Sequence, residues 1–302
     1  MQQDRNAARL AGDAERDPVA VDWSIVSLPD AWPDELDLRR PAHLVAYVRG
    51  WLGARRKVVV PADLPGGDRL PAYLRQEFHH LPNGVYSKRH ADSYARWFDR
   101  LMLGDTVRAR ARLAAELAGC RATLDVGCGS GGLAAAMRAA GVPEVWGLDP
   151  SPYLLQLAAR AHRGIRFVQG LAERTGFPAQ RFEGIGACFL FHELPPRAAD
   201  AALVELHRIL VPGGRLVIAE PSPTQFRVRA WRALARREGR RGLYFAAMAK
   251  WMYEPFVAGW HGRAVASWLA AHGFRVLGDE RGVPIRFVSA VRDEARSSVD
   301  HG

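Results

Sequence analysis

The chain has 302 residues, of which 48% are hydrophobic and 25% are charged. This composition is that of an ordinary globular protein and excludes a largely disordered chain, a collagen-like chain and a repeat array. Lysine and arginine total 42 against 32 aspartate and glutamate residues, which gives a formal net charge of +10. Almost all of the excess is arginine, which is typical either of coding bias or of an anionic partner such as nucleic acid, a lipid surface or an acidic substrate.

Several features of the sequence predict a cytoplasmic location. No apolar run is long enough to span a bilayer. Residues 1–20 carry many charges and lack the apolar stretch of a secretory signal. The three cysteines, Cys120, Cys128 and Cys188, form no Cys-x-x-Cys pair, so we interpret them as free thiols in a reducing compartment.

The N-terminal part of the chain is predicted to be an arm followed by helices. Residues 1–40 mix acidic residues, prolines and small residues, which predicts a partly disordered arm with Trp23 and Trp32 as candidate anchors. Within residues 41–118, apolar residues at three-to-four spacing predict a helix over 42–57 and one or two helices over 88–118.

From residue 119 onward, short apolar strands alternate with helices. The predicted strands lie at 122–126, 144–148, 165–168, 185–190 and 215–219, and the predicted helices at 133–140, 153–162, 198–210 and 263–272. This alternation predicts an α/β fold with a doubly wound, mostly parallel sheet covered on both faces. Two last strands, 275–277 and 285–291, are joined by a few residues and predict an antiparallel hairpin. The expected seven-stranded domain spans residues 119–292, with a tail at 293–302.

The strongest local signal is the run Leu124–Gly132, LDVGCGSGG, which joins the first strand of this domain to its first helix. Glycines in such a turn let the backbone approach a ligand closely, because no Cβ intervenes. The spacing of Gly127, Gly129 and Gly132 also fits the Gly-x-Gly-x-x-Gly pattern of dinucleotide-binding folds. A phosphate-bearing coenzyme is therefore an alternative ligand at this point.

Two acidic residues at strand ends help to distinguish these ligands. Asp125 lies two residues before the first glycine, where its carboxylate would repel a pyrophosphate and favour a ligand with an amine and a sulfonium. Asp149 ends the second strand, where a carboxylate can accept hydrogen bonds from ribose hydroxyls. Each residue could instead cap a turn or a helix. Both together, beside a glycine loop, favour a positively charged nucleoside.

In the order of its motifs the chain resembles the class I S-adenosylmethionine-dependent methyltransferases. Leu124–Gly132 is similar to the family's first motif, Leu148–Ser151 to its ribose-binding acidic motif and Val168–Glu173 to its adenine-binding segment. Phe182–Leu194 resembles the fourth-strand motif beneath the transferred methyl group, and Leu210–Leu216 resembles the turn before the fifth strand. The resemblance implies a Rossmann-like domain of the small-molecule methyltransferase type, with S-adenosyl-L-methionine as its cofactor.

The resemblance covers residues 86–292 and implies which residues hold the cofactor. They belong to the glycine loop, the ribose-binding motif, the adenine-binding segment and the end of the fourth strand: Asp125, Gly127, Cys128, Gly129, Gly131, Asp149, Pro150, Leu171, Ala172 and Phe189. Leu171 departs from the family's pattern, which usually has an acidic residue at this position. The adenine would then be held by backbone groups of Leu171 and Ala172 and by apolar contact.

Two candidate catalytic residues follow the fourth strand, where the family places residues that face the substrate. Methyl transfer mainly requires alignment of the reacting atoms, and it needs a general base only if the acceptor enters protonated. His192 is the first candidate base, because an ordinary histidine takes up protons near neutral pH, and Glu193 is the second. His192 could instead pack beside the cofactor or cap the next helix.

In this family, elements outside the nucleotide fold select the acceptor, and here the candidates are residues 41–118 and an insertion at 222–260. The insertion begins with many arginines and continues with a dense aromatic patch. This pattern suits a lid over a lipophilic or anionic acceptor, or docking on anionic lipid, and the alternative is a solvated arginine face with ordinary core packing. The predicted acceptor contacts are Tyr86, Tyr94, Tyr244, Trp251 and Tyr253.

The sequence therefore predicts a cytoplasmic enzyme that methylates an oxygen or a carbon of a small, hydrophobic or aromatic metabolite by in-line displacement. His79, His80 and His90 lack an acidic partner at ligand spacing, so no metal site is predicted. Three alternatives stay open: an S-adenosylmethionine-binding protein with other chemistry, an RNA methyltransferase and an NAD-dependent oxidoreductase. Nucleic acid is disfavoured, because no RNA-binding module is recognisable, whereas peripheral contact with an anionic membrane fits the arginines.

Overall fold

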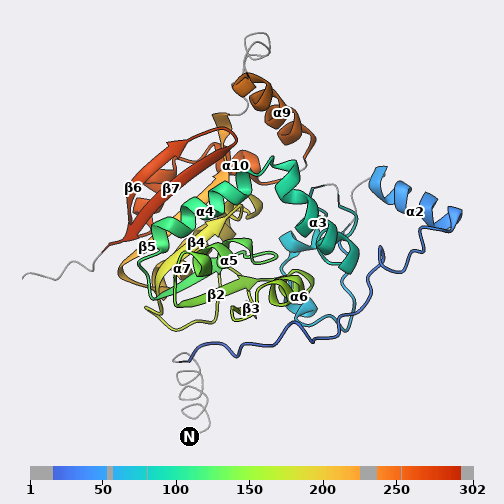
Figure 1. The fold of residues 1–302 in the computed structure, drawn as a ribbon, viewed down its shortest axis with the longest axis horizontal. Coiled ribbons are helices and arrows are strands. Elements are labelled where there is room, and N and C mark those ends of the chain that lie inside the picture. The colour runs from blue at the N-terminus through green and yellow to red at the C-terminus, as the bar shows by residue number, and fades with distance from the viewer. Residues whose placement is uncertain (1–15, 53–56, 80, 225–236, 253, 294–302) are drawn as a thin grey trace, which may run out of the picture.

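The computed structural model describes residues 16–52, 57–79, 81–224, 237–252 and 254–293. Its centre is a seven-stranded sheet with the strand order β3-β2-β1-β4-β5-β7-β6 (Figure 1). The first five strands run parallel, β7 runs antiparallel to β5, and β6 runs antiparallel to β7. The prediction of a doubly wound, mostly parallel sheet that ends in an antiparallel hairpin is confirmed.

The five parallel strands form from short apolar runs. They are β1 (Ala122–Val126), β2 (Glu144–Asp149), β3 (Arg166–Gln169), β4 (Phe182–Cys188) and β5 (Leu210–Pro221). Every residue of β1 is buried, because this strand has a neighbour on each side and helices over both faces. β1 occupies its predicted residues, and the other four strands differ from the prediction at one or both ends.

β5 is longer than the strand expected at 215–219. Leu210 pairs with Phe182 and Arg215 pairs with Gly184, so the residues between Leu210 and Arg215 bulge out of the ladder. Gly213 lies in this bulge with φ of 71°, a left-handed backbone that favours glycine. Beyond the bulge, β5 continues past the expected end and carries Glu220 to the carboxyl edge of the parallel strands.

The closing hairpin is made of β6 (Phe274–Arg281) and β7 (Ile285–Arg292). Arg286 of β7 is 1% exposed. Its Nε donates to Asp279 Oδ1 at 2.6 Å and its Nη2 donates to Asp279 Oδ2 at 2.5 Å. This bidentate pair crosses the hairpin and compensates for the burial of the guanidinium.

Helices cover both faces of the sheet, as Figure 1 shows for the near face. α4 (Asp105–Leu117), α5 (Gly132–Ala139) and α6 (Pro152–Ala161) contribute apolar side chains to one core cluster. α7 (Pro196–Ile209) and α11 (Val265–Ala271) contribute to the other. Each of these helices buries one stripe of residues against the sheet, which is what the three-to-four spacing of their apolar residues predicts.

The described part of the N-terminal arm, residues 16–40, runs along the β3 edge of the sheet and over α6 (Figure 1). Trp23 is 3% exposed, and its indole Nε1 donates to the carbonyl of Phe167 at 3.1 Å. The hydroxyl of Tyr153 donates to the carbonyl of Pro29 at 3.0 Å. These contacts anchor the arm to the sheet.

The region between the arm and β1 contains α2 (Pro41–Leu52), two 3₁₀ turns (Gly67–Arg69 and Ala72–Arg75) and α3 (Lys88–Leu101). α2 projects from the body at the right of Figure 1 and buries none of its residues. Ser87 caps α3 by accepting a hydrogen bond from the His90 amide. Gly104, with φ of 76°, separates α3 from α4, so the predicted helical stretch 88–118 is two helices.

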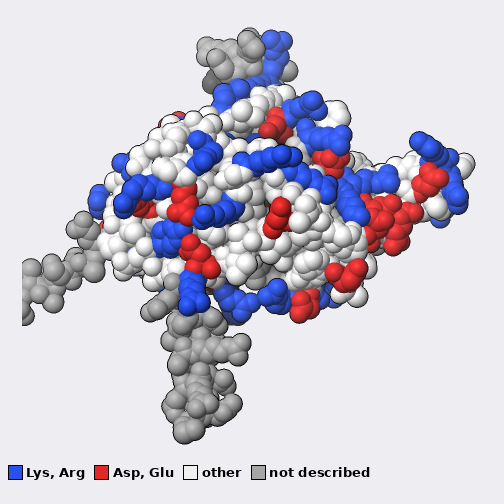
Figure 2. Space-filling view, turned by 60° about the horizontal axis from the view of Figure 1, so that its bottom comes forward, with Lys and Arg blue, Asp and Glu red and all other residues white. Residues whose placement is uncertain are grey.

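Within the insertion at 222–260, the structure describes α9 (Arg237–Trp251) and α10 (Val257–His261). The arginine-rich start of the insertion lies largely outside the described residues, as does most of the tail at 293–302. None of the described helices is both long and apolar enough to cross a bilayer. On the face seen in Figure 2, basic side chains are interspersed with acidic ones rather than gathered in one patch.

Candidate active site

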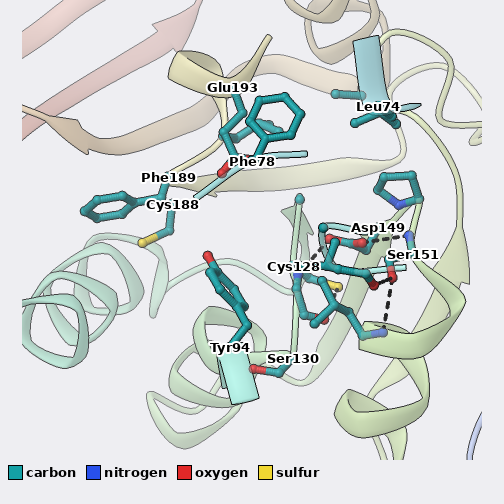
Figure 3. A pocket seen from close by; sticks show the side chains of 18 of the residues that line it. Leu74, Phe78, Tyr94, Cys128, Ser130, Asp149, Ser151, Cys188, Phe189 and Glu193 are labelled. Carbon is teal, nitrogen blue, oxygen red and sulfur yellow. Dashed lines mark hydrogen bonds between the residues drawn. The ribbon is translucent and has the colours of Figure 1, made fainter. Parts of the chain in front are cut away.

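A cavity lies at the carboxyl ends of β1, β2 and β4, where the parallel strands meet the N-terminal helical region (Figure 3). It encloses about 1280 Å³, its open mouth included. Figure 3 shows Asp149 and Cys128 on one side of this space and Tyr94, Phe189 and Glu193 on the other. Among the predicted cofactor residues, those that line it are Asp125, Gly127, Cys128, Gly129, Asp149, Pro150, Leu171, Ala172 and Phe189.

The glycine loop has the backbone that the sequence predicts for it. Gly127, Gly129 and Gly131 have φ of 69°, 52° and 83°, values that side-chain-bearing residues rarely adopt. A Cβ added to Gly129 would meet no atom within 4 Å, so the backbone there is open to the cavity. Gly131 is not part of the lining. It precedes α5, and a Cβ there would lie 2.9 Å from the ring of His162.

Asp125 is 1% exposed and ties the glycine loop to the helix that follows it. Its Oδ2 accepts a hydrogen bond from the Ala134 amide in α5 at 2.8 Å. Burial raises the pKa of Asp125 to about 7, although the Ala134 amide and Arg110 act in the opposite direction. Its carboxylate thus both caps a helix and lines the cavity.

Asp149 is held by two backbone amides at the end of β2. Its Oδ2 accepts from Gly129 and its Oδ1 accepts from Ser151, each at 2.9 Å. Burial raises the pKa of Asp149 to about 6. The cap of α6 is Ser151, whose hydroxyl accepts from the Leu154 amide. Asp149 therefore holds the glycine loop in place through the Gly129 amide.

Sequence reasoning missed Arg110, the one arginine or lysine among the described residues that line this cavity. It lies on α4, and a Cβ added to Gly132 would contact its guanidinium. Its Nη1 donates to Asp99 Oδ2 at 2.8 Å. No local pattern marks this arginine among its neighbours on α4, because only the packing of α4 against α5 brings it to the glycine loop.

A second, smaller chamber of about 580 Å³ adjoins the first. His79, Tyr94, Phe98, Phe189 and Glu193 line both chambers. The remaining lining of the second chamber is mostly apolar and includes His192 and Glu254: Leu101, Met102, His192, Pro221, Met248, Ala249, Met252, Glu254 and Pro284. The insertion thus contributes α9 and Glu254 to its wall.

His192, in the 3₁₀ turn Phe191–Glu193 after β4, is 1% exposed. Its Nδ1 lies 2.6 Å from Glu220 Oε2, and its Nε2 lies 3.7 Å from Glu254 Oε1. Burial works to lower the pKa of His192, but the carboxylates of Glu220 and Glu254 outweigh it and hold that pKa well above its ordinary value. His192 is therefore an imidazolium at neutral pH, which makes it a donor rather than a ready base.

Glu193, the second predicted catalytic residue, contacts a histidine from the N-terminal region. Its Oε1 accepts a hydrogen bond from His79 Nε2 at 2.8 Å. The other ring nitrogen of His79, Nδ1, lies 3.7 Å from Glu254 Oε1. No local pattern predicts this contact, because His79 and Glu193 are 114 positions apart.

The structure divides the predicted acceptor residues into three groups. Tyr86 and Tyr94 line the first chamber, and Tyr94 also lines the second. Tyr244 and Trp251 line neither chamber: the Tyr244 hydroxyl donates to the Leu101 carbonyl at 2.7 Å, and the Trp251 ring lies 6.5 Å from the Trp51 ring. Tyr253 lies outside the described residues. Within the described chain, no group of three or more potential ligands is arranged to hold a metal ion.

The strand order, the glycine loop after β1 and the acid that ends β2 define a class I, Rossmann-like methyltransferase domain. Residues 123–214 match the family model described as "Methyltransferase domain". Residues 123–214 are thus a methyltransferase domain of the Rossmann-like, class I kind, and S-adenosylmethionine is the cofactor of that class.

Two curated relatives are named demethylmenaquinone methyltransferase. The protein from Chlorobaculum parvum is 38% identical over 98 residues, which cover 32% of this chain and 40% of that protein. The protein from Thermus thermophilus is 39% identical over 132 residues, which cover 41% of this chain and 58% of that protein. The matches thus span 40% to 58% of the length of these relatives.

Among solved structures, the chain is similar to the 1,6-didemethyltoxoflavin-N1-methyltransferase of Burkholderia thailandensis, solved with 1,6-didemethyltoxoflavin and S-adenosylhomocysteine. The identity is 21% and the TM-score is 0.48, over 80% of this chain and 95% of that one. A TehB-like methyltransferase from Corynebacterium glutamicum is 20% identical with a TM-score of 0.47, over 68% of this chain and 99% of that one.

Proposed function

We propose that this protein transfers a methyl group from S-adenosylmethionine to an oxygen or a carbon of a small, hydrophobic or aromatic acceptor. The observation that carries the proposal is the pair of adjoining chambers, one beside the glycine loop and one between α3 and α9. Because five side chains line both, a ligand in the first chamber can meet a ligand in the second. Holding two reactants in this way is the main task of an enzyme for in-line displacement.

The residues of the first chamber fit the cofactor. Asp149 would accept hydrogen bonds from ribose hydroxyls, since each of its oxygens holds one amide hydrogen and a carboxylate oxygen has two lone pairs. Asp125 would face the positively charged end of the ligand, and Arg110 would pair with its carboxylate. The open side of Gly129 lets the ligand approach the backbone.

The adenine would lie against Leu171, Ala172 and Pro150, which line the same cavity without an acidic side chain among them. Gly127, Cys128 and Phe189 would contact the rest of the cofactor. Gly131 would act by shaping the loop, since its Cβ position is filled by His162 and Phe167. We therefore expect adenine recognition to depend on backbone groups and apolar contact.

The cofactor supplies a methyl group on a sulfonium, whose sulfur is a good leaving group. The protein's own residues align the acceptor and exclude water. Tyr94 and Phe189 form the wall common to both chambers, so they would hold the acceptor against the first chamber. His192 and Glu193 lie where the acceptor's polar atoms would arrive. Alignment of this kind lowers a barrier by about 7–11 kcal/mol.

The acceptor would be hydrophobic, because Met248, Met252 and Met102 line the second chamber together with aromatic rings. Methionine side chains adapt to the shape of apolar ligands. The relatives named demethylmenaquinone methyltransferase agree with a ring-shaped acceptor. We expect Tyr86 and Tyr94 to contact it or the cofactor.

A peripheral contact with anionic lipid would bring such an acceptor to the protein. One face of α2 exposes Leu44, Val45, Val48, Trp51 and Leu52, and we call these residues the α2 apolar face. Trp51 lies 6.5 Å from the exposed Trp251 at the end of α9, so the face reaches the insertion that lines the second chamber. Exposed apolar residues on an interfacial helix, with arginines nearby, are typical of membrane-surface binding.

The proposed activity is tested with purified protein and S-adenosylmethionine. Calorimetry should show binding of S-adenosylmethionine and S-adenosylhomocysteine but not of NAD. Incubation with a panel of hydroxylated aromatic compounds and quinols should yield S-adenosylhomocysteine in step with a product heavier by one CH₂ group, measured by mass spectrometry. Binding of NAD in place of the two nucleosides would contradict the proposal.

A further inference from the structure

Five side chains form an alternating series of carboxylates and imidazoles along the wall of the second chamber, and two of them, His79 and Glu193, also line the first. In order they are Glu220, His192, Glu254, His79 and Glu193. The outer links are close: Glu220 Oε2 to His192 Nδ1 is 2.6 Å, and His79 Nε2 to Glu193 Oε1 is 2.8 Å. Both inner links, from Glu254 Oε1 to His192 Nε2 and to His79 Nδ1, are 3.7 Å. Neither imidazole is therefore directly hydrogen-bonded to Glu254.

His79 has the features of a poised base. Its Nε2 must carry the proton of its bond to Glu193, because a carboxylate accepts and does not donate. In the neutral ring, Nδ1 then carries the lone pair, and this atom is buried without a hydrogen-bond partner in the described chain. Such an orphaned nitrogen is costly unless a ligand satisfies it.

The backbone of His79 is itself constrained. Its φ is 55°, in the left-handed region that non-glycine residues seldom occupy. Phe189, which lines both chambers with His79, has φ of 61°. Backbone strain of this kind clusters at functional sites. The ring of His79 also stacks on that of Tyr94 at 5.9 Å, which fixes its plane.

His192 is a hydrogen-bond donor at both ring nitrogens, in contrast to His79. Glu220 Oε2 accepts a hydrogen bond from His192 Nδ1–H. In the imidazolium form the other ring nitrogen, Nε2–H, is a second donor on the side of the second chamber. Burial works to raise the pKa of Glu254, but the imidazolium of His192 outweighs it and lowers that pKa below its ordinary value, so Glu254 is ionised beside it. A lone-pair nitrogen and an N–H donor thus approach one carboxylate oxygen from two sides.

His79, His192 and Glu254 all line the second chamber, so an acceptor oxygen in that chamber can approach both imidazoles. The separation of 3.7 Å between each ring nitrogen and Glu254 Oε1 exceeds a direct hydrogen bond. A hydroxyl oxygen bound there would donate its proton to His79 Nδ1 and accept from His192 Nε2–H. A ketone or ether oxygen could use only the second of these bonds.

We propose that His79, positioned by Glu193, is the general base for a hydroxyl group of the acceptor, and that His192 binds the same oxygen, so that the acceptor is a phenol or an enol. This inference rests on the proposed function. His79 and Glu254 lie outside the matched residues 123–214, so the subsite is built by the N-terminal region and the insertion rather than by the common domain.

The proton balance of the step is simple. His79 Nδ1 takes the hydroxyl proton and later releases it to solvent. The oxygen, or a ring carbon conjugated with it, forms a bond to the methyl carbon while the electron pair of the broken carbon–sulfur bond returns to sulfur. Glu193 and Glu220 act as positioning residues for the two imidazoles, and Glu254 holds the imidazolium of His192 beside the oxygen. General base catalysis of this kind contributes about 10²–10⁴-fold.

The test uses para-nitrophenol, whose phenolate is coloured, bound to the full chain with S-adenosylhomocysteine. At a pH below the pKa of the free dye, the wild-type protein should shift the bound dye toward phenolate by about tenfold or more. His79→Phe, which keeps the stack on Tyr94, should abolish the shift, and Glu193→Gln should reduce it. The titratable groups that face His79 are Glu193, Glu254, His192 and the phenol of Tyr94, and burial raises the pKa of Tyr94 far out of the assay range.

Two controls separate this inference from the proposed function. His43→Phe, the same substitution at a histidine that lines neither chamber, should leave the shift unchanged. Para-nitroanisole, which lacks the hydroxyl, should bind wild type and His79→Phe alike. The inference would be overturned if the dye were equally ionised in wild type and His79→Phe, or if the wild type bound the phenol no better than its ether. Calorimetric binding of S-adenosylhomocysteine would still leave the proposed function intact. Failure of the dye to bind would also count against it.

Discussion

Two buried carboxylates set how the proposed cofactor site responds to pH. Burial raises the pKa of Asp125 to about 7 and that of Asp149 to about 6. Both must be ionised to face a cationic nucleoside and accept its hydroxyl hydrogens. We therefore expect the affinity for S-adenosylmethionine to increase as pH rises through 6 to 7, with protons released on binding, which calorimetry in buffers of different ionisation enthalpy measures.

Asp149→Asn serves as the matched variant for this prediction. It keeps the size of the side chain but loses the charge and one acceptor, so affinity at high pH should fall by about tenfold, as expected for a lost charge-assisted bond. The affinity of this variant for S-adenosylmethionine should depend on pH only through the ionisation of Asp125. A wild-type affinity that does not change with pH, or an unaltered variant, would show that Asp149 is outside the binding site.

The same pKa shifts act on folding, with the opposite sign. A carboxyl whose folded pKa lies above its unfolded value of 3.8 favours the folded state fully only below that value. The contribution is lost as pH rises through about 6 for Asp149 and about 7 for Asp125. The cofactor-free protein thus carries a cost in stability at neutral pH that ligand binding would offset.

Residues with local sequence signals were easier to predict than those without. Asp125, Asp149 and the glycines stand beside strand ends, and the rule that parallel strands place their carboxyl ends at one edge is enough to gather them. Arg110 and Glu254 carry no such signal, because only tertiary packing brings them to the cavity. The position of His192 after the fourth strand was predictable, but its protonation depends on Glu220, 28 positions away.

At the scale of elements, Glu220 of β5 fixes the turn that follows β4. This residue has no exposed surface. Its Oε1 accepts from the amides of Leu190 and Phe191, and its Oε2 accepts from His192 Nδ1. One carboxylate on a central strand thus orders the turn that carries both predicted catalytic residues.

Removing this carboxylate should strongly destabilise the protein. Glu220→Leu leaves the imidazolium and two amides without their acceptor in the interior, and breaking a buried pair of this kind costs about 3–5 kcal/mol. Glu220→Gln keeps an acceptor for the amides and should cost less. Urea unfolding measures both. Glu280→Leu, a change of an exposed glutamate on β6, should have little effect, and equal stability of Glu220→Leu and wild type would refute the role assigned here.

The insertion shows where element-scale prediction from sequence reached its limit. The aromatic density of 222–260 favoured Tyr244 and Trp251 as acceptor contacts, yet Met248 of α9 and Met252 just after it line the second chamber. Which face of a helix points inward depends on what it packs against, and here Tyr244 of α9 contacts Leu101 at the end of α3, far away in the sequence. Prediction of the sheet was easier, because alternation of strands and helices constrains its topology strongly.

At the scale of the whole molecule, the α2 apolar face provides a test of the proposed lipid contact. Val48→Glu with Leu52→Glu should lower binding to phosphatidylglycerol vesicles by about tenfold, because it replaces apolar contact with charge repulsion. The thermal midpoint should not change, since α2 buries no residue. Vesicle co-sedimentation measures the first quantity and thermal unfolding the second.

Val204→Glu is the control for this experiment, because Val204 is 61% exposed on α7, on the other side of the sheet. It should bind vesicles as the wild type does. Loss of binding in both variants would point to a general effect of added negative charge, and binding retained by the α2 variant would exclude this face as the lipid contact.

The wall common to the two chambers has a thermodynamic consequence. Tyr94 and Phe189 contact whatever occupies either side, so an occupant of one chamber sets the positions of rings that the second occupant must also meet. Linkage then requires that each ligand change the affinity of the other by the same factor. Screens for acceptors run without the nucleoside would consequently rank compounds against an incompletely shaped surface, and weak binders in such a screen deserve a second measurement with S-adenosylhomocysteine present.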